Sequence, residues 1–173
     1  MKRLSKKRKI LCIILLLILA ADMAFIFYNL SENADKSGNR SGEVTEIIVS
    51  TCYSGYEELS AAEKEKVLSK ADPVVRELAH MTEFIPLGFS LSALLFAIYQ
   101  PKGRKTGKLS LISLGCGALY ALSDEMHQLF VDGRGFQLFD IFMDSCGCTV
   151  GIIIALIIYG IAAKSIEKKK KKL

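Results

Sequence analysis

The chain has 173 residues, of which 51% are hydrophobic, and its formal net charge is +5. The apolar residues come in long blocks, a pattern that indicates a membrane protein and excludes an evenly mixed soluble domain. Most of the 23 Lys and Arg residues lie in the segments 1–9, 101–108 and 164–173, as in the cytoplasmic flanks of membrane spans. No aromatic-interleaved basic motif accompanies this charge, so we expect no nucleic-acid partner.

The first predicted element is a membrane span over residues 10–30, which are apolar except for Asp22 and Asn29. At a rise of about 1.5 Å per residue, this run is long enough to cross a bilayer. A cleaved signal peptide has a similar layout, but the run is longer than a typical signal core and lacks a clean small-x-small site. We therefore favour an uncleaved anchor. Whether Asp22 faces the bundle interior or is tolerated through local water stays open.

Residues 31–72 are predicted to form an acidic extracytoplasmic loop. The Ser, Gly and Asn content of residues 31–43 is typical of a flexible linker. Ser60 and Glu63 have the spacing of a capping box, which predicts a short helix that ends near Ala71. The loop is either an ordinary solvated segment or a cap over a site, and both alternatives remain open.

The second predicted span covers residues 73–99. Asp72 and Pro73 are typical of an N-cap followed by proline at the first helical position, so we expect a new helix to begin there. Pro86 is predicted to kink this helix. Three polar residues at the spacing i, i+4, i+7 share one face of it: Arg76, His80 and Glu83.

Two more spans are predicted after a basic cytoplasmic turn at residues 101–108. The third covers residues 109–130 and ends in a polar cluster. A turn around Gly133 and Arg134 leads to the fourth span, over residues 136–163, which a run of lysines stops on the cytoplasmic side.

The predicted fold class is therefore an all-α membrane protein. We expect a bundle of four transmembrane helices with cytoplasmic N and C termini and an extracytoplasmic loop that contains a short helix. In chain order the expected parts are a basic N-terminus, an anchor helix, the acidic loop, a three-span domain and a basic tail: residues 1–9, 10–30, 31–72, 73–163 and 164–173.

Polar residues from three spans are predicted to lie at one depth. Counted from the cytoplasmic end of each span, Glu83, Asp124 and Asp144 lie roughly 22 to 24 Å up an apolar core about 30 Å thick. We therefore expect a shared polar site near the outer leaflet. Other candidates lie about one turn or more further out: His80, Gln128, Asp140, Arg76 and Arg134.

The start of the fourth span carries both acids and glycines on one face. Asp140 and Asp144 are four residues apart, and Gly147 and Gly151 continue the same face as a GxxxG pattern, which predicts close helix packing. Burying several carboxylates for packing alone would be destabilising, so we assign the acids to a functional site. Internal pairing of these acids with the arginines and histidines is the structural alternative.

The joint pattern of these residues resembles the VanZ-like family of bacterial membrane proteins. It consists of Arg76-x-x-Ala79-His80-x-x-Glu83-Phe84, then Asp124-Glu125-x-His127-Gln128, Gly133-Arg134 and Asp140-x-x-x-Asp144-x-x-Gly147-x-x-x-Gly151. The chain departs from the family at Glu77, Phe84 and Asp144, where Lys, Tyr and Asn are common. The resemblance implies a multi-pass cell-membrane protein in a family linked with low-level resistance to teicoplanin-type glycopeptides. It supplies no established reaction.

The first functional hypothesis is a non-catalytic binding site that faces outward. Arg76 and Arg134 would hold a phosphate or carboxylate, because a guanidinium group offers paired donors to both. Acidic residues would orient the arginines or bind amine and hydroxyl groups: Glu83, Asp124, Glu125 and Asp140. The expected partners are membrane lipids and either a lipid-linked cell-wall precursor or a glycopeptide.

The alternative is an envelope enzyme that acts on a phospholipid or a polyprenyl phosphate. His80 or His127 would be the general base, with Glu83 and Asp124 as orienting groups or metal ligands. No local ligand motif such as HExxH occurs, so we expect no cofactor, and a divalent metal is left open. A small ion transporter ranks last, since few polar residues lie below the outer layer.

Overall fold

The computed structural model describes residues 5–31 and 34–170, which form helices and short connections without any strand. This part of the chain confirms the predicted all-α fold. Residues 1–4 and 171–173, which belong to the predicted basic N-terminus and basic tail, lie outside the described residues. The elements are α1 (Lys6–Leu30), α2 (Ala34–Cys52), the short 3-10 helix η1 (Tyr56–Glu58), α3 (Ala61–Tyr99), α4 (Arg104–Gln128) and α5 (Leu138–Lys170).

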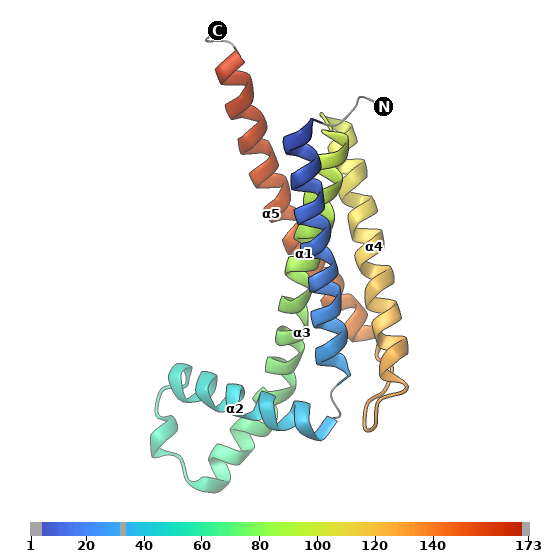
Figure 1. Cartoon of the computed structure of the whole chain (residues 1–173). Coiled ribbons are helices and arrows are strands. Elements are labelled where there is room, and N and C mark those ends of the chain that lie inside the picture. Colours follow the sequence, from blue (N-terminus) through green and yellow to red (C-terminus); the bar gives the residue numbers. More distant parts are fainter. Residues whose placement is uncertain (1–4, 32–33, 171–173) are drawn as a thin grey trace.

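Helices α1, α3, α4 and α5 run lengthwise as a bundle, and α2 lies across one end of it (Figure 1). Helix α3 is central, since it packs most extensively against α5 and also contacts α1, α4 and α2. Both termini lie at the end of the bundle opposite α2, where α5 diverges from the other helices (Figure 1). The end that carries the termini is called the terminal end below, and the opposite end is called the loop end.

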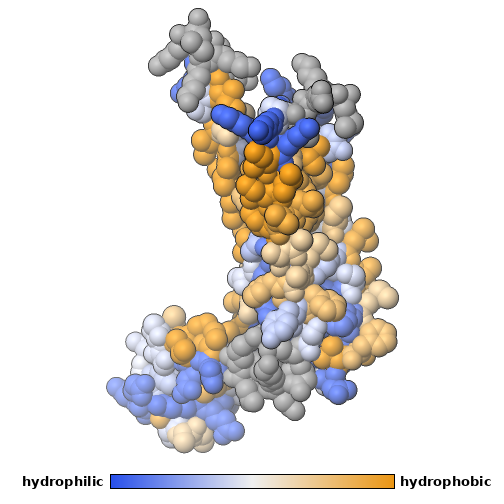
Figure 2. Space-filling model, viewed as in Figure 1, coloured by the Kyte–Doolittle hydropathy of each residue, from blue (hydrophilic) through white to orange (hydrophobic). Residues whose placement is uncertain are grey.

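Within residues 5–31 and 34–170, three helices are long and apolar enough to cross a membrane. They cover Lys6–Asn29, Ala61–Tyr99 and Leu138–Ile166. Helix α4 has 25 residues but is not among them, because its serines, glycines and acids lower its mean hydropathy. The fourth span therefore stays a prediction. Figure 2 shows a continuous hydrophobic surface on the part of the bundle toward the terminal end and a mixed surface toward the loop end.

The predicted flexible linker at residues 31–43 is wrong, because α2 begins at Ala34 and continues to Cys52. Thr45 and Val49 are buried on one side of α2. The Thr45 hydroxyl donates a hydrogen bond of 3.1 Å to Asp72 Oδ1 on α3. Tertiary packing of one helix face thus overrides the low helix propensity of the Gly and Ser residues.

The predicted helix boundary at Asp72 and Pro73 is also wrong. Helix α3 begins after the Ser60–Glu63 capping box, which is present as predicted, and continues through Pro73 and Pro86 to Tyr99. The Asp72 side chain is engaged by Thr45 on α2 and does not cap a new helix. A proline inside a helix removes one backbone hydrogen bond, which the surrounding packing tolerates here. At the other end of the chain, α5 continues past the predicted end at residue 163 to Lys170.

Helices α3 and α5 approach each other at glycines. A Cβ atom added at Gly147 would collide with the Met81 carbonyl oxygen, and one at Gly151 would collide with the carbonyl oxygen of Ile85. From the other side, Gly88 on α3 lies against the backbone of Cys148. Such contacts between backbones require residues without a side chain. They hold the first half of α5 against the middle of α3.

Candidate functional site

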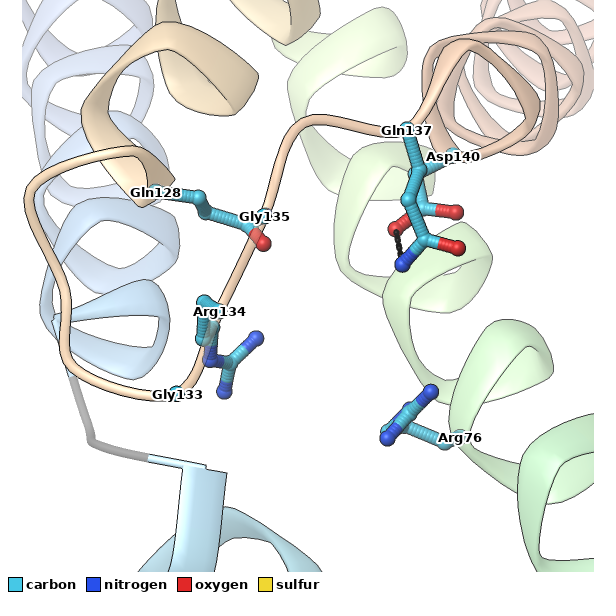
Figure 3. Close-up of a pocket in the computed structure, with 7 residues that line it drawn as sticks. All are labelled: Arg76, Gln128, Gly133, Arg134, Gly135, Gln137 and Asp140. Carbon is cyan, nitrogen blue, oxygen red and sulfur yellow. Dashed lines mark hydrogen bonds between the residues drawn. The ribbon is translucent and has the colours of Figure 1, made fainter.

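A polar cavity of about 110 Å³ lies at the loop end of the bundle (Figure 3). Residues from α3, the end of α4, the α4–α5 loop and the start of α5 contribute to its walls. Figure 3 shows the side chains of Arg76 and Arg134 pointing into this space from opposite sides. The lining residues are Arg76, Gln128, Gly133, Arg134, Gly135, Gln137 and Asp140.

The conformation of the α4–α5 loop places Arg134. The backbone N–H of Arg134 donates a hydrogen bond of 3.1 Å to the Val131 carbonyl oxygen, which closes a turn. Gly133 has φ of 77° inside this turn. This left-handed conformation favours glycine, since a Cβ atom would be strained there. The turn therefore depends on Gly133 to direct Arg134 toward α3.

Glu125 holds the loop to the end of α4. Its side chain is only 1% exposed. One carboxylate oxygen accepts a hydrogen bond of 2.7 Å from Gln128 Nε2, and the other accepts one of 2.7 Å from the backbone N–H of Gln137. These two short hydrogen bonds let Glu125 fix two residues of the cavity wall. We assign it a positioning role.

Asp140 forms the acidic wall of the cavity. Its Oδ2 accepts a hydrogen bond of 3.4 Å from Gln137 Nε2, which is drawn in Figure 3. Both Arg76 and Arg134 lie close enough to attract its charge. The Glu77 side chain also forms a hydrogen bond with the Asp140 carboxyl group. Asp140 is therefore held by Gln137 and by Glu77 at the cavity wall.

A second layer of acids lies below the arginines. Asp124 and Asp144 are each 3% exposed. Asp144 has Asp124, Glu125, Asp140 and Glu83 as acidic neighbours, and Arg134 acts on Asp124 with opposite charge. The structure thus brings together Glu83, Asp124 and Asp144, the acids that the sequence predicts at one depth in the membrane. Since buried like charges repel, the arginines above this layer are its available counter-charge.

Other predicted residues lie outside the cavity. Glu83 accepts a hydrogen bond of 2.9 Å from Asn29 Nδ2, which links α3 to α1. His127 Nε2 is 3.3 Å from Ser31 Oγ, and its ring packs on Phe27 with 4.5 Å between centroids. His80 is half-buried and is not a lining residue. Neither histidine is therefore placed as a general base in this cavity.

Asp22 also lies apart from the cavity. Its Oδ2 accepts a hydrogen bond of 2.8 Å from the hydroxyl of Ser90, a fully buried residue of α3. Asp22 and Glu83 line a separate crevice between α1 and α3. The Asp22 side chain thus faces α3.

Two polar residues at the site were missed by sequence reasoning. Gln137 lines the cavity and bonds both Glu125 and Asp140, yet it stands alone in the loop without a periodic pattern. Glu77 interacts with the Asp140 carboxyl group and was noted only as a departure from a family pattern. Its position next to Arg76 was the available signal. Among the described residues, no three His, Cys, Asp or Glu side chains are placed to hold a metal ion.

Comparison with known proteins identifies one family. A family model described as VanZ/LLP1 matches residues 12–159, which is most of the chain and includes every lining residue of the cavity. This family is not known to need a cofactor. No curated protein and no solved structure matches the chain significantly.

Proposed function

Because the chain belongs to the VanZ/LLP1 family, we propose that it is a multi-pass protein of the bacterial cell membrane that binds an anionic group at its outer face. The observation that carries this proposal is the pair of arginines, Arg76 and Arg134, that point into one cavity from separate elements. Guanidinium groups suit phosphate and carboxylate because their N–H donors match the oxygen geometry.

The proposed topology has four membrane spans, with α4 as the span that apolar composition alone does not identify. The described basic residues of 5–9, the loop 101–108 and the end of α5 all belong to the terminal end of the bundle (Figure 1). Since Lys and Arg concentrate on the cytoplasmic side, we place the terminal end inside the cell and the cavity outside. Residues 31–72 then form an extracytoplasmic arm, and residues 73–163 form the three-span domain.

Reporter fusions test this topology. Alkaline phosphatase fused after Gly55 should be active, because the arm would be outside the cytoplasm. The same reporter fused after Lys105 should be inactive. Activity of the second fusion without activity of the first would reverse the orientation.

The proposed ligands share an anionic group: a lipid phosphate, the pyrophosphate of a lipid-linked wall precursor, or a carboxylate of a teicoplanin-type glycopeptide. The cavity of about 110 Å³ is small, so it suits a headgroup and not a whole antibiotic. Binding of this kind would contribute to glycopeptide resistance or to envelope homeostasis. The two arginines that point into the cavity favour binding of an anionic group as the function we propose.

The proposed function is tested by teicoplanin susceptibility of a sensitive bacterium that expresses the chain. Arg76→Ala and Arg134→Ala should each lose any protection that the unmodified chain gives, at equal protein level in the membrane. Arg104→Ala, at the terminal end, is the matched control and should keep it. Full protection by both cavity variants would overturn the role of the arginines.

A further inference from the structure

A second cavity lies at the terminal end of the bundle. It has a volume of about 320 Å³ and lies between α1, α3 and α5, where α5 diverges (Figure 1). Helices α1 and α5 both pack on α3 but not extensively on each other, which leaves this slot between them. The lining residues are Arg8, Leu11, Leu15, Phe89, Ala93, Phe96, Ala97, Gln100, Ala155, Ile158, Tyr159 and Ala162.

The walls of the slot are apolar and partly made of small residues. Alanines of α3 and α5, including Ala97 and Ala155, leave space that larger side chains would fill. The rings of Phe96 and Tyr159 lie 5.0 Å apart, and the Tyr159 hydroxyl donates a hydrogen bond of 2.9 Å to the Pro101 carbonyl oxygen. The phenol is therefore satisfied within the protein, and the walls suit a hydrocarbon chain.

Arg8 is the charged residue of the slot. It lies in the first turns of α1, is half-buried, and forms no ion pair with any acid that the structure describes. No carboxylate lines the slot. Lys6, Lys7 and Lys9 add positive charge around it. A half-buried guanidinium at an apolar slot with no acid nearby is suited to an external anion.

We propose that this slot binds one acyl chain of an anionic phospholipid from the cytoplasmic leaflet, with Arg8 and Gln100 at its phosphate. Basic pockets between membrane helices on the cytoplasmic side bind anionic headgroups in this way, because the leaflet there supplies anionic lipids. The proposal rests on the membrane orientation given under Proposed function but not on the outer cavity, since no residue lines both cavities.

Native mass spectrometry of the full chain in detergent tests this proposal. With equal amounts of phosphatidylglycerol and phosphatidylcholine, the chain should retain one phosphatidylglycerol in preference. Arg8→Gln should lower this retention roughly tenfold, as expected for the loss of a charge-assisted contact. Lys7→Gln is the matched control, because Lys7 is exposed and does not line the slot.

A second pair of variants separates the acyl chain from the headgroup. Ala97→Leu should fill the slot and lower retention of phosphatidylglycerol, whereas Ala20→Leu, on an exposed part of α1, should not. A helical circular dichroism spectrum and monomeric elution establish that each variant is folded. Equal retention of the two lipids, or equal effects of Arg8→Gln and Lys7→Gln, would overturn the proposal. A lipid-free dimer of the unmodified chain would also overturn it, since a second copy would then occupy the slot.

Discussion

The two ends of the bundle both carry arginines, but their surroundings differ. At the loop end, Arg76 of α3 and Arg134 of the hydrogen-bonded α4–α5 loop lie among buried acids such as Asp140. At the terminal end, Arg8 lies beside an apolar slot without a carboxylate. A cavity with compensated charge selects ligands by geometry, whereas an uncompensated arginine selects by charge. Changes to the two ends should therefore have separate consequences.

The largest expected effect comes from a substitution that destabilises the bundle and so damages both of its ends. Gly151→Leu should prevent close packing of α5 on α3, because even a Cβ atom would collide with the Ile85 carbonyl oxygen. Overpacking of this kind costs about 3 kcal/mol or more for a large side chain against backbone. Thermal unfolding in detergent should show the loss. Gly160→Leu is the control, since nothing lies within 4 Å of a Cβ atom there, and equal unfolding temperatures for the two variants would refute the contact.

A smaller effect should be confined to the loop end. Glu125→Ala removes the acceptor for Gln128 and for the Gln137 backbone. We expect a loss of about 2 kcal/mol in unfolding free energy, as for charge-assisted hydrogen bonds. Teicoplanin protection should be lost, while phosphatidylglycerol retention at the terminal end should remain. Loss of both functions in a folded variant would show that the two ends are coupled.

The smallest effect should come from the link between α1 and α3. Asn29→Ala removes the hydrogen bond to Glu83, and we expect a loss of about 1 kcal/mol in unfolding free energy. Glu83→Gln is the comparison, because its side-chain oxygen can still accept from Asn29. Chemical denaturation in detergent measures both variants. A larger loss for Glu83→Gln than for Asn29→Ala would mean that Glu83 contributes mainly through another contact.

The local features of the fold could be predicted from the sequence, and the long-range ones could not. Ser60 and Glu63 form the predicted capping box because both partners lie in one helical turn. The sequence did not predict α2 or the continuity of α3, where Thr45 and Asp72, 27 residues apart, form a hydrogen bond between the two helices. Helix propensity reflects the residue types within a short stretch of sequence, so it cannot predict a contact between distant residues.

The candidate site could also be predicted only in part from the sequence. Helical spacing places Asp140 and Asp144 on one face and predicts a shared depth for the acids. The role of Glu125 at the loop depends on the backbone N–H of Gln137, which every residue except proline has, so no residue pattern marks it. The sequence makes His127 a candidate base because it is polar and lies close in sequence to Asp124 and Glu125. Its side chain turns toward Phe27 and Ser31 of the α1 end and away from the cavity.

Direct binding of an anionic ligand to the loop-end cavity is the central measurement. Native mass spectrometry with a polyprenyl phosphate, and separately with teicoplanin, should show a complex of the unmodified chain with at least one of them. Arg134→Ala should weaken that complex roughly tenfold or more, and Arg104→Ala should leave it unchanged. Binding that is unaffected by both Arg134→Ala and Arg76→Ala, in folded protein, would contradict an anion site at this cavity.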